Sequence, residues 1–189
     1  MSDRLTTWFP LALLSVLAAL SLWLDQMVQP APERSAIQRH DPDYVIENFA
    51  ATRMGPDGVA RDRLSANKMM HFPDDDSTVL EFPHFVRFEP TRASVSVTAK
   101  HANVSSNGDN VEFMDDVKVV RGAYREHSAM VLTTSYLHVI PDQDLARTDK
   151  DVMIVDANTK ITAVGLEFNN RAQTLKLMSH VRGTYVKPR

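Results

Sequence analysis

The stretch AKHANVSSNGDNVEFMDDVKV, residues 99–119, decides the fold. Small or apolar residues alternate with polar ones on both sides of the polar segment 105–110. Such alternation is typical of strands that bury one face, and a short polar segment containing glycine is typical of the turn between them. The stretch therefore predicts a strand, a turn and a further run of strand.

The apolar spacing of this stretch recurs twice, each time without a gap. An offset of 35 residues gives a matching pattern at positions 134–154, and an offset of 64 gives another at positions 163–181. A weaker copy at positions 66–86 requires two extra residues in its turn. Any two alternating strands match at some offset, but the constant length of the turn favours a true repeat. Repetition at a period of about 30 to 35 residues indicates stacked units that bury their apolar faces against one another.

The rest of the chain after residue 42 extends the same pattern. Turn signals such as GPDG at 55–58 and PDDD at 73–76 separate short apolar runs, and no segment has a sustained helical period. Pro83 interrupts two such runs, which is typical of an edge strand or a bulge. We predict an all-β domain of many short antiparallel strands over residues 43–189. A sandwich or jelly roll is favoured over a solenoid at this length.

Composition excludes several classes of function. The chain of 189 residues carries a net charge of −3 at pH 7 and contains no cysteine. Because it lacks a basic field that would attract phosphates, we predict no nucleic-acid partner. The absence of cysteine excludes disulfides, thiolate metal sites and a cysteine nucleophile.

The N-terminal segment has the pattern of a membrane anchor. Residues 5–24 contain no charged side chain and lie between Arg4 and Asp25. A helix of that length reaches about 30 Å, the thickness of the hydrocarbon core of a bilayer. Trp8 and Trp23 lie near its ends, where indole rings favour the membrane interface. A cleaved signal peptide would end at a small-x-small site, which the residues after 24 do not offer, so we predict an uncleaved transmembrane helix.

The segment after this helix has the composition of a spacer. Residues 25–42 include Pro30, Pro32 and Pro42 together with mixed charges, which is typical of an extended linker. The simplest topology is a short cytoplasmic tail at residues 1–4, the helix at 5–24, the linker at 25–42 and a β domain beyond the membrane.

Signatures of catalysis are missing from the sequence. It contains no G-x-S-x-G elbow, no H-E-x-x-H pair and no phosphate-binding glycine loop. The seven histidines are scattered, and the acidic runs at 74–76 and 115–116 fall where turns favour aspartate. We therefore predict no enzymatic activity, no metal and no cofactor. Inward-facing apolar strands and two terminal edge strands are instead the parts of a lipid groove and of a strand-addition surface.

The order of several motifs resembles one known family. Asp41-Pro42-Asp43-Tyr44, GVARDRLSA at 58–66, PDDDS at 73–77 and VEFMDDV at 111–117 follow an N-terminal apolar helix. Over nearly its whole length the chain resembles the LptC family, the membrane-anchored component of the lipopolysaccharide export machinery of Gram-negative bacteria. The family often carries Gly-Asn where this chain has Asp115-Asp116. Whether the bulge expected at this position forms with two aspartates is a question for the structure.

The resemblance implies a place within a transport complex. It implies a single-pass protein of the inner membrane whose C-terminal domain is a periplasmic β-jellyroll of the fold shared by the bridge protein of the export system. The N-terminal end of the jellyroll would face the inner-membrane ABC transporter subunits, and the C-terminal end would add a strand to the bridge protein. Lipopolysaccharide would pass through the shared interior.

Two sets of residues are candidates for these contacts. We predict that the lipid-binding interior consists of Val97, Ala99, Val104, Phe113, Val117, Val119, Leu137, Val139, Val152, Ile154, Phe168, Leu175 and Leu177. We predict that partner binding at the C-terminal edge involves Gly165, Thr184, Tyr185 and Val186. For each interior residue, packing of the core is an equally good interpretation.

Two other functional classes stay open at this point. One is a membrane-anchored structural scaffold with a packed β core and no lipid cargo. The other is a periplasmic enzyme that acts on envelope glycans, which would need paired carboxylates converging on a cleft.

Overall fold

The computed structural model describes residues 3–28, 40–89, 91–125, 128–172 and 174–187. The chain divides into two compact units, residues 1–39 and 40–189, and each is described by itself. In the first unit, helix α1 spans Asp3–Val28, so it includes the predicted helix at 5–24 and continues into the predicted linker. Residues 29–39 of that linker lie outside the described residues.

Helix α1 exposes most of its apolar side chains. Its 26 residues correspond to a length of about 39 Å. Leu14, Leu22 and Trp23 are each more than half exposed. Over the residues that the structure describes, no helix has the length and apolarity needed to span a membrane.

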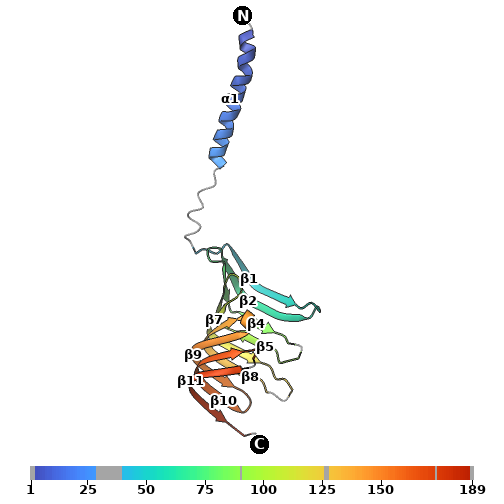
Figure 1. Cartoon of the computed structure of the whole chain (residues 1–189), viewed down its shortest axis with the longest axis vertical. Helices are drawn as coiled ribbons and strands as arrows, with labels where there is room; N and C mark the ends of the chain where they lie inside the picture. Colours follow the sequence, from blue (N-terminus) through green and yellow to red (C-terminus); the bar gives the residue numbers. More distant parts are fainter. Residues whose placement is uncertain (1–2, 29–39, 90, 126–127, 173, 188–189) are drawn as a thin grey trace. The chain divides into compact units, whose positions relative to one another are not determined.

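The second unit is a single antiparallel sheet, shown in Figure 1. Its strands are β1 (Tyr44–Met54), β2 (Ala60–Phe72), β3 (Ser77–Glu81), β4 (His84–Arg87), β5 (Val95–Thr98), β6 (His101–Val104), β7 (Val111–Arg121), β8 (Met130–Ile140), β9 (Leu145–Val155), β10 (Thr159–Asn169) and β11 (Thr174–Tyr185). Over the described residues, these strands pair in chain order except that β3 does not pair with β4, and β5 does not pair with β6. A short 3₁₀ turn, η2 (Pro141–Gln143), joins β8 to β9. The predicted all-β antiparallel fold is confirmed.

Two pairs of short strands are halves of longer ones. Strands β3 and β4 both pair with β2, and the chain bends between them at Phe82, where φ is 51°, and at the fully buried Pro83. Strands β5 and β6 both pair with β7 in the same way. When each such pair is counted once, the eleven strands form nine. Pro83 therefore lies at a bend inside the sheet. The prediction of an edge strand at Pro83 is wrong, because both β3 and β4 have neighbouring strands on two sides.

Long strands replace the short ones expected from the sequence. The apolar runs at 111–113 and 117–119 belong to the single strand β7, because Asp115 and Asp116 adopt left-handed φ values of 62° and 53° and the ladder resumes beyond them. The bulge therefore forms with two aspartates. The polar segment 105–110 is the predicted turn, closed by a hydrogen bond from the Ser105 N–H to the Asn110 carbonyl at 3.0 Å.

The three copies of the sequence repeat are three stacked β-hairpins. They comprise β6–β7, β8–β9 and β10–β11. Positions related by the offset of 35 residues share one line of cross-strand neighbours, because Val104 pairs with Val111, Val111 with Val139 and Val139 with Ala146. The sequence repeat therefore reflects the cross-strand register of the sheet, because equivalent positions of successive hairpins fall on one line.

A line of bulges bends the sheet into two facing halves. The register shifts after Met114 in β7, after Thr134 in β8 and at Gly165 in β10, where φ is 79°. One buried cluster contains Phe113 from one side of this line and Val97 from the other side. A second cluster, centred on Leu132, Val152, Ile154, Ala163 and Leu166, continues the core toward β11. The inner faces of both halves thus form one apolar interior.

Candidate lipid groove and docking edges

The inner face of the sheet consists of rows of cross-strand neighbours. The central row includes Leu80, Ala102, Phe113 and Leu137. On one side of it lies a row that we call the first margin: Tyr44, His71, Thr78, Val104, Val111, Val139, Ala146, Phe168 and Leu175. Beyond the bulges, at the opposite ends of the strands, lies the second margin: Arg53, Asp62, Arg87, Val95, Arg121 and Met130.

The predicted lipid-binding residues all lie on this inner face. Seven are buried: Val97, Ala99, Phe113, Val117, Leu137, Val152 and Ile154. Five are partly buried and pack against the two clusters: Val104, Val119, Val139, Phe168 and Leu177. Leu175 is 45% exposed. The sequence therefore predicted the face correctly, and contact of these residues with lipid stays a prediction.

The apolar side chains of the interior become exposed to solvent on the last strand, β11. Leu175 continues the first margin, and Val181 and Tyr185 lie on the same face of β11, where they are 52% and 66% exposed. Strand β11 pairs only with β10 among the described strands, so nothing in the described part of the chain covers this end. Water contact with such a row is unfavourable, which makes it a surface for a lipid or for a further strand.

The predicted partner-binding residues divide between the edge and the interior of the sheet. Thr184 and Tyr185 lie in β11, and the Val186 N–H donates to the Asn158 carbonyl at 2.9 Å just beyond its end. Gly165 lies in β10, one strand in from the edge, and is buried. A Cβ at Gly165 would lie 2.9 Å from Met178 Cγ, so this glycine permits the close approach of β11 to β10.

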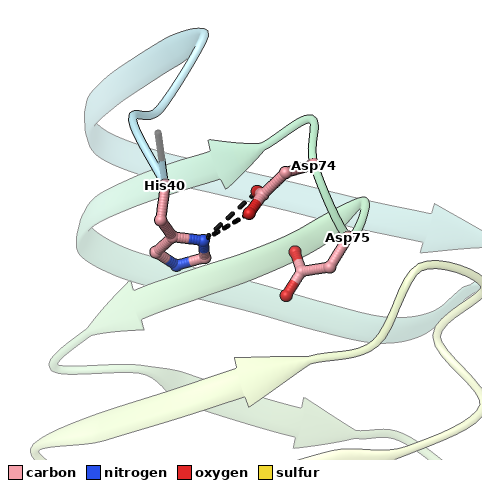
Figure 2. A group of neighbouring side chains, drawn as sticks. All are labelled: His40, Asp74 and Asp75. Atoms are coloured by element: carbon pink, nitrogen blue, oxygen red, sulfur yellow. Dashed lines mark hydrogen bonds and ion pairs between the residues drawn. The ribbon is translucent and has the colours of Figure 1, made fainter. Parts of the chain in front are cut away.

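Two histidines tie the beginning of β1 to the turn between β2 and β3. His40 Nδ1 lies 2.9 Å from Asp74 Oδ2 (Figure 2). The His40 ring also stacks on Phe72, with centroids 4.0 Å apart. His71 lies between two carboxylates, with Nδ1 2.8 Å from Asp43 and Nε2 2.9 Å from Asp76. The sequence does not show these contacts, because the partners, apart from Asp76, are 28 and 34 residues away from the histidines.

These contacts change the protonation of both rings. The hydrogen bond to Asp74 raises the pKa of His40 above 6.5, and the hydrogen bonds to Asp43 and Asp76 raise the pKa of His71. Both nitrogens of His71 face carboxylate oxygens that accept hydrogen bonds, which is the arrangement of an imidazolium ring. His40, Asp74 and Asp75 also present one donor atom each within 4.8 Å of one another, but all three are exposed and Asp75 accepts a hydrogen bond from the Ser77 N–H.

The comparisons agree with the geometry of the sheet. The family model described as "Lipopolysaccharide-assembly, LptC-related" matches residues 11–186. The chain belongs to the LptC family. Membership assigns it a role in lipopolysaccharide transport through a jellyroll of this type. No curated protein matches the chain significantly.

A solved structure shares the fold at very low sequence identity. LptH of Pseudomonas aeruginosa, the LptA-homologous periplasmic component of the lipopolysaccharide transport device, superposes with a TM-score of 0.54 and 7% identity. The match covers 67% of this chain and 95% of LptH. At such identity the likeness supports the fold alone, and it confirms the predicted jellyroll of the bridge type.

Proposed function

We propose that this LptC-family chain accepts lipopolysaccharide from the inner-membrane ABC transporter into the apolar interior of its sheet. It then passes the lipid to the periplasmic bridge protein, which docks on the free edge of β11. The observation that carries this proposal is the continuity of the inner rows, which run from β1 through two buried clusters to exposed apolar residues on the last strand. The chain contributes no catalytic step.

The energetics of the cargo explain why such an interior is needed. Exposure of one acyl chain of about twelve carbons to water costs on the order of 10 kcal/mol, at about 0.8 kcal/mol per methylene. A lipid with several chains therefore crosses an aqueous space only when its chains stay covered. A row of similar apolar positions covers the chains at every step without a single tight site.

We also propose that α1 anchors the chain in the inner membrane, with the β unit in the periplasm. Twenty uncharged residues at 5–24 and the exposed leucines of α1 support this assignment, because burying so many apolar side chains in the hydrocarbon core of a bilayer is favourable. A chain recovered in the soluble fraction after cell disruption, without detergent, would contradict it.

Site-specific photo-crosslinking in cells tests the groove directly. Crosslinkers at Phe113 and Leu177 should capture lipopolysaccharide when the transporter hydrolyses ATP, and capture should fall when its ATPase is inactivated. Met178, the neighbour of Leu177 on the opposite face of β11, is 49% exposed and provides a matched control that should capture none.

The same experiment decides between a conduit and a scaffold. If folded protein with crosslinkers at Phe113 and Leu177 never captures lipid, while the edge positions still capture the bridge protein, the chain is a membrane-anchored scaffold with a packed core. Energy-dependent adducts at both inner positions exclude that alternative.

A further inference from the structure

The second margin carries arginines at the mouth of an otherwise apolar interior. Arg53, Asp62, Arg87 and Arg121 are related to one another through successive cross-strand pairs, with Val95 between the last two. Alternation along the strands places them on the inner face, because the core residues Leu64, Phe85 and Val119 lie two positions away on β2, β4 and β7. The first margin contains no arginine or lysine at its described positions.

One buried carboxylate orients two of these arginines. Asp62 is 8% exposed. It accepts hydrogen bonds from Arg53 Nε at 2.7 Å and from Arg87 Nε at 3.1 Å, and Arg53 Nη2 also contacts it. Two guanidinium groups therefore share a single negative charge. A buried carboxylate that orients two guanidinium groups in this way leaves one positive charge and several outward N–H groups that Asp62 itself does not neutralise.

An open hollow of about 230 Å³ lies directly over these groups, and its lining consists of Arg53, Arg61, Asp62, Arg87, Phe88 and Glu89. Two of the neighbouring charges are engaged, since Arg61 pairs with Asp57 at 2.7 Å and Glu89 pairs with Arg92 at 3.6 Å. The aromatic ring of Phe88, which is 38% exposed, adds an apolar wall. A hollow with arginine forks beside an apolar wall suits the boundary between the head group and the chains of an anionic lipid.

One contact across the mouth is weak enough to be exchanged. Arg87 Nη1 lies 3.9 Å from a carboxylate oxygen of Asp144, which belongs to the turn between β8 and β9. Asp144 also lies 3.6 Å from Arg171. At 3.9 Å the Arg87 contact is a loose ion pair between partly exposed groups, and such pairs contribute little to stability. A phosphate offers more acceptor oxygens and more charge than this carboxylate.

We propose that Arg53 and Arg87, oriented by Asp62, bind a phosphate group of the transported lipid at the mouth of the groove. This inference rests on the proposed lipid conduit. The acyl chains occupy the interior while the phosphate replaces Asp144 as the partner of Arg87. Asp62 is a positioning residue that does not contact the lipid.

Paired lipids test the proposal on the full chain in uncharged detergent micelles, with a crosslinker at Phe113. Lipopolysaccharide with its lipid A phosphates should compete for capture about tenfold better than the same lipid after phosphatase treatment. In Arg53→Gln this preference should fall to less than about threefold, with capture of the dephosphorylated lipid unchanged. Arg87→Lys keeps a positive charge beside Asp62 but loses the planar guanidinium group, which can donate two parallel hydrogen bonds to a phosphate. It should lower the preference for phosphorylated lipid to a similar extent.

Arg63 provides the matched control. It is the neighbour of Asp62 on β2, points to the opposite face and is exposed, with Nε 3.3 Å from Thr52 Oγ1. Arg63→Gln should keep the full preference for phosphorylated lipid. An equal loss in Arg63→Gln would reduce the effect to net charge and overturn the proposal.

The remaining outcomes separate this inference from the proposed function. Equal capture of both lipids by the unmodified chain overturns the phosphate site but leaves the conduit intact, whereas capture of neither overturns the conduit. Millimolar inorganic phosphate should not compete. If it does, the hollow binds free phosphate and the head-group assignment is overturned. Binding of phosphatidylglycerol vesicles that Arg53→Gln weakens equally would assign the hollow to a membrane surface and also overturn it.

Discussion

At the scale of single residues, a few backbone conformations determine where the sheet bends. Asp115, Asp116 and His180 adopt left-handed φ values of 62°, 53° and 51°, which cost roughly 1 kcal/mol or more each for residues with a Cβ. Their side chains offset part of this cost, because Asp115 contacts His101 at 3.1 Å and Asp116 contacts Lys100 at 2.5 Å. At the corresponding position of β10 the chain uses Gly165, for which a positive φ costs little.

Gly165→Ala should destabilise the β unit by about 1–3 kcal/mol, because alanine resists the positive φ and its Cβ would lie 2.9 Å from Met178 Cγ. Denaturant unfolding of the full chain measures the change. The double variant with Met178→Ala should recover the steric part only.

Gly165→Arg should weaken docking of the bridge protein, because the arginine side chain would displace β11. Unchanged docking of a folded Gly165→Arg variant, measured by co-purification, would contradict this prediction.

The His71 contacts predict a pH dependence of stability. Because the folded pKa is raised above 6.5, the stabilisation is fully present below pH 6.5 and is lost as pH rises through the folded pKa. The groups that face the ring are Asp43, Asp76 and the stacked Tyr44. Thermal unfolding between pH 6 and 9 should show this loss. His71→Gln should remove the part due to His71 and leave the part due to His40, whose pKa is also raised by Asp74. A His84→Gln control should keep the dependence, and an NMR titration of His71 at or below 6.5 would contradict the prediction.

At the scale of elements, the last strand presents half of its backbone groups to solvent. The hydrogen bond from the Val186 N–H to Asn158 shows that residues 184 and 186 direct their N–H groups toward β10, so Tyr185 directs its N–H to the free edge. Such an edge accepts one further strand.

Proline scanning of β11 tests this geometry. Tyr185→Pro removes only an outward N–H, so it should block docking of the bridge protein while the fold is retained. Thr184→Pro should disrupt the pairing of β10 with β11 and lower stability. Co-purification and thermal unfolding separate the two effects. Normal docking of a folded Tyr185→Pro variant would contradict strand addition at this edge.

Prediction from sequence succeeded for features encoded locally. The hairpin repeat, the turn at 105–110 and the inner face followed from alternation and constant spacing. The length of the last strand was underestimated, because the left-handed residue His180 interrupts the alternation of apolar residues without ending the ladder of β11. The charged contacts of Asp62 with Arg87 and of His40 with Asp74 were missed because they join residues 25 and 34 positions apart.

At the scale of the whole molecule, one continuous interior connects two free edge strands, β1 and β11, among the described strands. If the edge of β11 is the exit, closing it should trap cargo upstream. Tyr185→Pro combined with a crosslinker at Phe113 should therefore give more lipid adduct than the crosslinker alone, in cells with an active transporter. A reduced adduct would indicate that docking is required before loading.

Because the strands follow one another across the sheet in nearly consecutive order, the number of strands sets the length of the lipid path, while the length of each strand sets the depth of the groove. The rows run across the strands, so each strand lengthens the path by about 4.8 Å, and nine strands give about 40 Å. A longer strand would only deepen the walls. Distance is therefore gained in whole strands, two per hairpin, and a relative joined edge to edge extends the same path without any change in its cross-section.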